Sequence, residues 1–104
     1  DTEYSNEDRR VYELHIPERE LANMDILPTV LMLVAADKHL AQQGCLDCAL
    51  SSSAFFYPEQ ITQAGGLMLC TALTSNGKAG FSVEAEVYTE TETFAKAMLI
   101  FTER

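Results

Sequence analysis

The chain has 104 residues, a length that fits one domain with a small hydrophobic core. Hydrophobic residues make up 47% of the sequence, which excludes a disordered chain. Acidic residues outnumber basic ones by 16 to 7, so the surface would repel nucleic acids and anionic membranes, and we predict neither as a partner.

The first predicted element is a short strand at residues 11–16, preceded by a polar lead at residues 1–10. Its apolar side chains are Val11, Tyr12, Leu14 and Ile16. Pro17 ends the strand, because proline cannot donate to a strand ladder. A charged connector then leads to residue 25, and we predict a single domain over residues 11–104.

The longest apolar segment predicts a helix from Ile26 to Gln43. Asp25 is placed to cap its first turn, and Gly44 is suited to end it. Pro28 falls in the first turn, where a missing N–H costs nothing. Apolar residues cover every face of this segment, and a helix that is apolar all round is a buried one. We therefore expect the strands that follow to curl around it.

Four strand-like segments fill the rest of the chain, at residues 45–57, 66–75, 79–89 and 92–102. The segment at 79–89 alternates apolar and polar residues, which is typical of an antiparallel strand with one wet face. Asn76-Gly77 is a strong hairpin signal. The order strand, helix, four strands predicts an α+β fold in which a curved antiparallel sheet wraps one long central helix.

Residues 11–102 resemble the hotdog fold of acyl-CoA thioesterases and acyl-ACP dehydratases. The stretch NMDILPTVLMLVAAD resembles the loop and central helix of that fold. The stretch from Phe55 to Glu103 resembles its segment in which a strand ends at a proline and a glycine-containing loop leads into three antiparallel strands. The resemblance implies a homodimer or a dimer of dimers, joined through strand edges, with the acyl chain in a tunnel at the dimer interface.

Asp25 is the first candidate catalytic residue. In the hydroxybenzoyl-CoA type of hotdog thioesterase, an Asp precedes the helix in the pattern Asp-x-x-Gly-His-x-Asn. Asp25 matches that Asp, whereas Pro28 and Thr29 replace the Gly and His. The resemblance implies that Asp25 attacks the thioester or activates a water, with the N–H groups of Thr29 and Val30 binding the oxyanion. The alternative is that Asp25 only caps the helix.

Asp37 is the second candidate catalytic residue. In the phenylacetyl-CoA type, an acid inside the helix faces across the dimer interface, and Asp37 lies at about that depth. The His-Gly-Gly of that type is absent here, and Asn23 is taken as the counterpart of its upstream Asn. The alternative is a solvated carboxylate. A dehydratase is less favoured, because Val34 occupies the place of its acid and His15 lies on the first strand.

The motif Cys45-x-x-Cys48 follows the predicted helix and enters a strand. Zinc requires four ligands, and no second pair completes the set, so we predict no metal site and no cofactor. Redox pairs usually lie at a helix N-terminus, so we predict free thiols here. Three cysteines without a visible signal peptide favour reduced thiols in the cytoplasm.

These features predict a hotdog protein that binds an acyl thioester, either acyl-CoA or acyl-ACP, at a dimer interface and hydrolyses it. The predicted substrate-binding residues are Asn23, Pro28, Thr29, Val30, Phe55 and Phe56. Two alternatives stay open: a module that binds or senses an acyl ligand without catalysis, and a dimerisation domain of a larger protein. The missing Gly and His near Asp25 favour the first of them.

Overall fold

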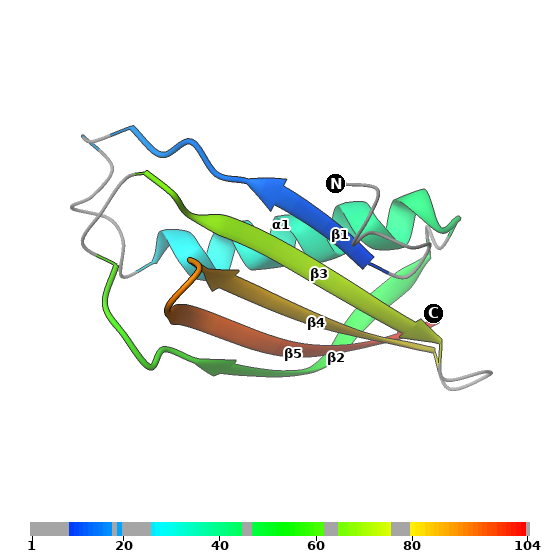
Figure 1. Cartoon of the computed structure of the whole chain (residues 1–104). Helices are drawn as coiled ribbons and strands as arrows, with labels where there is room; N and C mark the ends of the chain where they lie inside the picture. Colours follow the sequence, from blue (N-terminus) through cyan, green and yellow to red (C-terminus); the bar gives the residue numbers. More distant parts are fainter. Residues whose placement is uncertain are drawn as a thin grey trace.

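The fold is one sheet and one helix. A computed structural model describes residues 9–17, 19, 26–44, 47–61, 65–75 and 80–103. Its elements, in chain order, are β1 (Arg9–Glu13), α1 (Leu27–Gln42), β2 (Cys48–Phe56), β3 (Met68–Ser75), β4 (Phe81–Tyr88) and β5 (Thr93–Glu103). The strands form a single antiparallel sheet in the order β1-β3-β4-β5-β2, which curves beside α1 (Figure 1).

The core lies between α1 and the three central strands. β3, β4 and β5 follow one another as a meander, and α1 packs against all three. Every second residue of these strands points toward α1, as the twofold periodicity of a strand requires. In the middle row, Leu73 pairs with Val83 and Val83 with Leu99, and all three are buried.

A buried polar contact also joins the helix to the sheet. His39 and Thr71 are both fully buried, and His39 Nδ1 lies 2.8 Å from Thr71 Oγ1, within hydrogen-bonding distance. The other buried residues of α1 are all apolar: Pro28, Met32, Ala35, Ala36 and Leu40. The hydrogen bond offsets the cost of burying two polar side chains in this core.

The predicted α+β fold with a curved antiparallel sheet and one long helix is confirmed. The expectation that every face of the helix is buried is wrong for the single chain, because Val30 is 44% and Val34 60% exposed. The five-stranded sheet covers only one face of α1, so the opposite apolar face has no cover from the rest of the described chain.

Several predicted boundaries differ from the structure. The capping position of α1 is occupied by Ile26 without a side-chain cap hydrogen bond, not by Asp25, which lies outside the described residues. β1 begins at Arg9, two residues inside the predicted polar lead, and β2 begins at Cys48 rather than at residue 45. Within the described residues, no helix combines the length and the hydropathy needed to cross a membrane.

Candidate functional site

The large exposed apolar side chains lie on two surfaces of the molecule. Among the described residues there are eight: Ile26, Val30, Val34, Leu50, Phe56, Tyr57, Met98 and Ile100. They belong to α1, to β2 and to β5, or to the residue next to one of these elements, and β5 is the strand beside β2 in the sheet. Phe56, Met98 and Ile100 lie on the sheet face away from α1, whereas Ile26, Val30 and Val34 lie at or on α1. Exposed apolar surface marks an interaction or ligand site, so we place the candidate site where the start of α1 meets the end of β2.

β2 is an edge strand of nine residues. It pairs with β5 along one side, and no other described strand pairs with its second side. The ladder is interrupted between Leu50 and Ser52, where the Ser51 hydroxyl donates to the Ile100 carbonyl at 3.1 Å. A long edge of unpaired N–H and C=O groups is a template for pairing with another strand.

The two predicted phenylalanines lie on opposite faces of β2. Phe55 is opposite Ala97, which is buried, so Phe55 points to the face that α1 covers, and it packs against the core. Phe56 is opposite Lys96 and points to the other face of the sheet. Only Phe55 therefore shares a face with α1, because successive residues of a strand alternate.

A hydrogen bond joins the start of α1 to the end of β2. It links the hydroxyl of Thr29, in the first turn of the helix, to the hydroxyl of Tyr57, the residue after β2. Thr29, Leu33 and Asp37 follow one another at intervals of four residues and so lie along one face of α1. We call these three residues, with Leu50, Phe55 and Tyr57, the α1–β2 side.

The predicted site residues are not all brought together. Asn23 and Asp25 lie outside the described residues. Pro28 is buried, and the Val30 N–H, predicted as an oxyanion donor, already donates to the Ile26 carbonyl at 3.3 Å. Asp37 is exposed and lies eight residues after Thr29, about 12 Å further along the helix axis. Of the predicted residues that the structure describes, Thr29 and Phe55 lie near the end of β2 on the side of α1, and Phe56 lies there on the opposite face of the sheet.

No protein-family model matches the chain, and no curated protein matches its sequence. Solved structures do match it. One is a thioesterase from Thermus thermophilus complexed with coenzyme A and Zn, with a TM-score of 0.62 and 14% identity over 94% of this chain and 79% of that one. Another is protein af1124 from Archaeoglobus fulgidus, with a TM-score of 0.53 and 13% identity over 96% and 80%. The chain has the hotdog fold.

Cys70, a free cysteine of this hotdog chain, is not an activated nucleophile. Cys70 lies on β3 and is 6% exposed. Burial raises the pKa of its thiol, and the Arg9 guanidinium, whose Nη2 lies 3.8 Å from the sulfur, opposes that shift only in part. Cys70 also points away from α1, because its partner Glu86 lies between the inward-facing Ala85 and Val87. A neutral, buried thiol is a structural group.

The prediction of free thiols is wrong for Cys48, which is disulfide-bonded; Cys45 lies outside the described residues. Because its sulfur is already bonded, Cys48 cannot serve as a thiolate ligand or nucleophile in this state. No group of three or more His, Cys, Asp or Glu in the described part of the hotdog domain is arranged to hold a metal ion.

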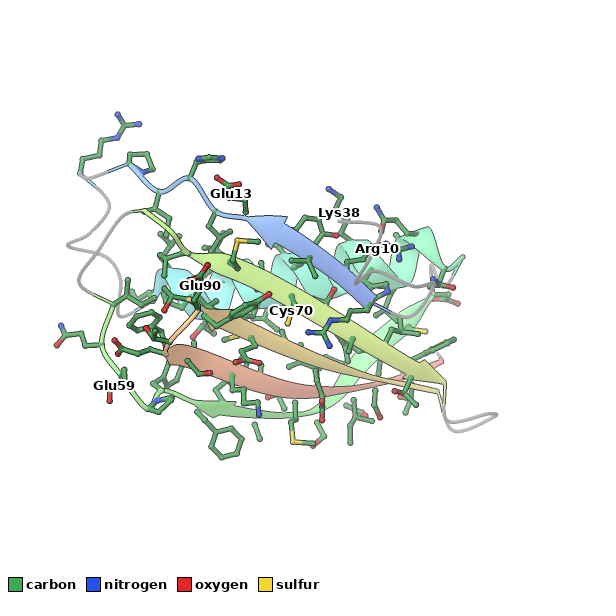
Figure 2. The ribbon with its side chains drawn as sticks, viewed as in Figure 1. Arg10, Glu13, Lys38, Glu59, Cys70 and Glu90 are labelled. Carbon is green, nitrogen blue, oxygen red and sulfur yellow. The ribbon has the colours of Figure 1, made fainter. Side chains whose placement is uncertain are left out.

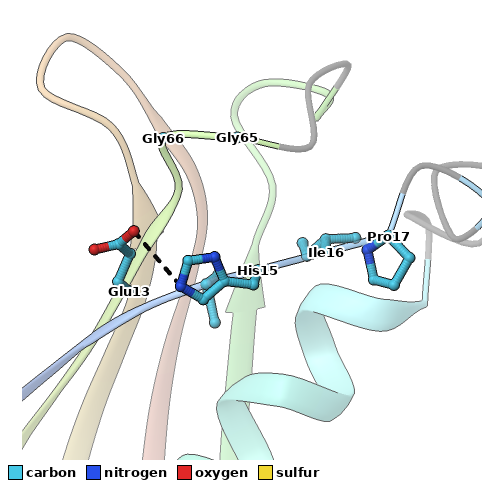
Figure 3. A pocket seen from close by; sticks show the side chains of 7 residues that line it. Glu13, His15, Ile16, Pro17, Gly65 and Gly66 are labelled. Carbon is cyan, nitrogen blue, oxygen red and sulfur yellow. Dashed lines mark ion pairs between the residues drawn. The ribbon is translucent and has the colours of Figure 1, made fainter.

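A shallow recess of about 470 Å³ lies at the end of β1 (Figure 3). Its lining residues are Glu13, Leu14, His15, Ile16, Pro17, Gly65 and Gly66. His15 Nε2 lies 3.6 Å from Glu13 Oε1, but both side chains are well exposed, so the ion pair is weak. The recess is open to solvent, whereas the α1–β2 side combines apolar surface with two paired hydroxyls.

Tyr57 is not among the predicted site residues, although its hydroxyl contacts that of Thr29. Thr29 and Tyr57 are 28 residues apart, so no local pattern links them. One signal was present in the sequence, since a tyrosine two residues after an inward-facing phenylalanine points to the same face of a strand.

Proposed function

We propose that this hotdog chain binds an acyl thioester, of coenzyme A or of an acyl carrier protein, on the α1–β2 side of a homodimer and hydrolyses it. The observation that carries the proposal is the exposed apolar surface of Ile26, Val30 and Val34 beside the contact between α1 and the end of β2. The likeness to a thioesterase that was solved with coenzyme A supports the class of ligand.

The homodimer is supported by what one chain leaves uncovered. Antiparallel pairing of β2 with β2 of a second copy would satisfy the open edge and extend the sheet across both chains. The second copy would also cover the exposed stripe of Val30 and Val34 on α1. Small domains commonly complete their burial of apolar surface in this way. A further pairing of dimers is compatible with the outer sheet face, where Met98 and Ile100 are exposed.

The anionic carrier requires basic residues in a chain with a formal charge of −9. Arg10 and Lys38 supply such a patch where α1 passes β1 (Figure 2). Arg10 Nε donates to Gln42 Oε1 at 3.2 Å, and Lys38 Nζ lies 5.4 Å from the centre of the Tyr12 ring. Both cations are anchored to a neighbouring side chain, which lowers the entropy cost of meeting a phosphate.

Two carboxylates remain the proposed catalytic groups. Asp25, as nucleophile or general base, precedes the first turn of α1 and is therefore close to Thr29 in sequence. Asp37 is the alternative. About 12 Å separates it from Thr29 along the helix axis, so it would act on a thioester held by the second chain of the dimer.

The testing experiment is thiol release from short, medium, long and aromatic acyl-CoAs, with thermal shift measured on the same samples. We expect turnover that falls on the order of 10²-fold in Asp25→Ala, with Asp37→Ala as the second variant. Glu84→Gln, on the outer sheet face, serves as the control and should keep full turnover. Turnover that survives in both aspartate variants would remove this site assignment.

A second candidate function is acyl-ligand binding without hydrolysis. It is favoured by the first turn of α1, where Pro28 has no N–H and the Val30 N–H is already engaged, so backbone oxyanion donors are few. A rise in melting temperature without thiol release would select this function. No response in either measurement would contradict both.

A further inference from the structure

Tyr57 presents a polar group within an otherwise apolar surface. Its side chain is 50% exposed, and its hydroxyl is hydrogen-bonded to the hydroxyl of Thr29. The exposed apolar residues Ile26 and Val30 lie on the same first turn of α1. The pair is therefore open to a ligand, with apolar residues on the same helix turn.

Two hydroxyls that are hydrogen-bonded to each other keep one O–H group free to donate a further hydrogen bond. Each hydroxyl carries one O–H donor and two acceptor lone pairs. The bond between Thr29 and Tyr57 uses one of the two protons, whichever residue donates, so the other O–H can donate to a third atom. A ligand oxygen without protons, such as a carbonyl oxygen, matches this arrangement, because it accepts one bond and offers none.

We propose that the Thr29–Tyr57 hydroxyl pair binds the carbonyl oxygen of the acyl thioester, an assignment that rests on the proposed function. The pair adds a donor to a first turn that has few, since Pro28 has no N–H and the Val30 N–H donates to Ile26. Tyr57 thereby brings the end of β2 into the site, so the two elements of the α1–β2 side act on one ligand atom.

The same contact serves hydrolysis. When water adds to the carbonyl carbon, a C–O bond forms and the π electrons of the C=O move to its oxygen, which the free O–H of the pair then stabilises as an oxyanion. Collapse restores the C=O and breaks the C–S bond. One proton of the attacking water passes to the general base and then to the sulfur, which gives a carboxylic acid and a free thiol.

Two inert ligands isolate the carbonyl contact. The first is a ketone analogue of the acyl-CoA, in which CH₂ replaces the thioester sulfur and the carbonyl is kept. The second is the matching S-alkyl thioether of coenzyme A, which has the sulfur but no carbonyl. Each is made with an octanoyl-length and with a benzyl-type group, and binding to the full chain is measured by calorimetry.

We expect the wild-type protein to bind the ketone about threefold to tenfold more tightly than the thioether, the range of one net hydrogen bond. Tyr57→Phe, which keeps the ring, should remove this preference by weakening only the ketone. Thr29→Val should do the same, and Thr29→Ser should restore it. The matched control is Tyr88→Phe, at a tyrosine that faces away from α1 on β4, and it should leave the preference unchanged.

The outcomes separate the two proposals. A ketone preference that persists in both Tyr57→Phe and Thr29→Val would overturn this assignment and leave the proposed function standing. Wild-type protein that binds none of the four ligands would overturn the proposed function, and this assignment with it. A loss of binding to ketone and thioether alike in Tyr57→Phe would identify a structural role for Tyr57 and would also contradict the assignment.

Discussion

At the residue scale, the hydrogen bond between His39 and Thr71 tests how the helix is held on the sheet. Thr71→Val keeps the shape of the side chain and deprives a fully buried ring nitrogen of this partner. We expect a loss of about 1–3 kcal/mol in the free energy of unfolding, measured with urea. Thr74→Val, at an exposed position of the same strand, should change it by less than about 0.5 kcal/mol. Equal effects of the two substitutions would contradict this role.

Gly80 is required by a close approach of two strands. Its φ of +115° favours glycine, and a Cβ at this position would overlap the carbonyl oxygen of Phe101 on β5. We expect Gly80→Ala to lower the free energy of unfolding by more than about 1 kcal/mol, read from the denaturant midpoint. Gly65→Ala meets no atom within 4 Å and is the matched control. An unchanged free energy of unfolding in Gly80→Ala would show that β5 shifts freely here.

The contribution of the Cys70 thiol to the free energy of unfolding depends on pH. Burial raises the pKa of Cys70 above its ordinary value of 9.0, so the folded state holds the proton more tightly than the unfolded state. This contribution is therefore complete below pH 9 and is lost as the pH rises through the folded-state pKa. We expect the stability of the wild type to fall more steeply above about pH 9 than that of Cys70→Ala, in urea titrations at several pH values. Parallel curves would contradict the raised pKa.

At the scale of elements, the open edge of β2 tests the route of dimerisation. Neighbouring N–H groups of a strand point to opposite sides, so of Ser52 and Ser53 one N–H faces β5 and the other faces the open edge. Proline at the serine whose N–H faces β5 should lower the melting temperature by breaking the β2–β5 ladder. Proline at the serine whose N–H faces the open edge should convert the dimer to a monomer, measured by sedimentation. A dimer that persists in both variants would show that β2 is not the interface.

The helix and strands were largely predictable, because the residues that begin and end them are close to them in the sequence. Pro28 and Gly44 bracket the helix closely, whereas the predicted Asn76-Gly77 turn between β3 and β4 lies outside the described residues. The capping residue was not predictable, because Asp25 is the better cap former by type and yet Ile26 occupies the position. The Tyr57 hydroxyl contact depends on where β2 and α1 meet in three dimensions, which no spacing in the sequence encodes.

At the scale of the whole molecule, the uncovered face of α1 predicts an assembly. An apolar helix face looks the same in a sequence whether its own sheet or a second chain covers it, which is why the exposure of Val34 was missed. Val34→Lys should weaken the proposed dimer by about tenfold or more, measured by sedimentation over a range of concentrations, because a charge would be desolvated at the interface. Thr74→Lys, on the outer face of β3, is the control and should leave the dimer intact. Equal dissociation constants would place α1 outside the interface.

The strand order also sets a sequence of events during synthesis. β2 is made before its partner in the sheet, β5, because β3 and β4 lie between them in the chain. The meander of β3, β4 and β5 joins neighbours in sequence and can form early, whereas β2 must wait until β5 has left the ribosome. Until then both edges of β2 are unpaired and open to neighbouring nascent chains. Deletion of β5 would leave β2 in that state permanently.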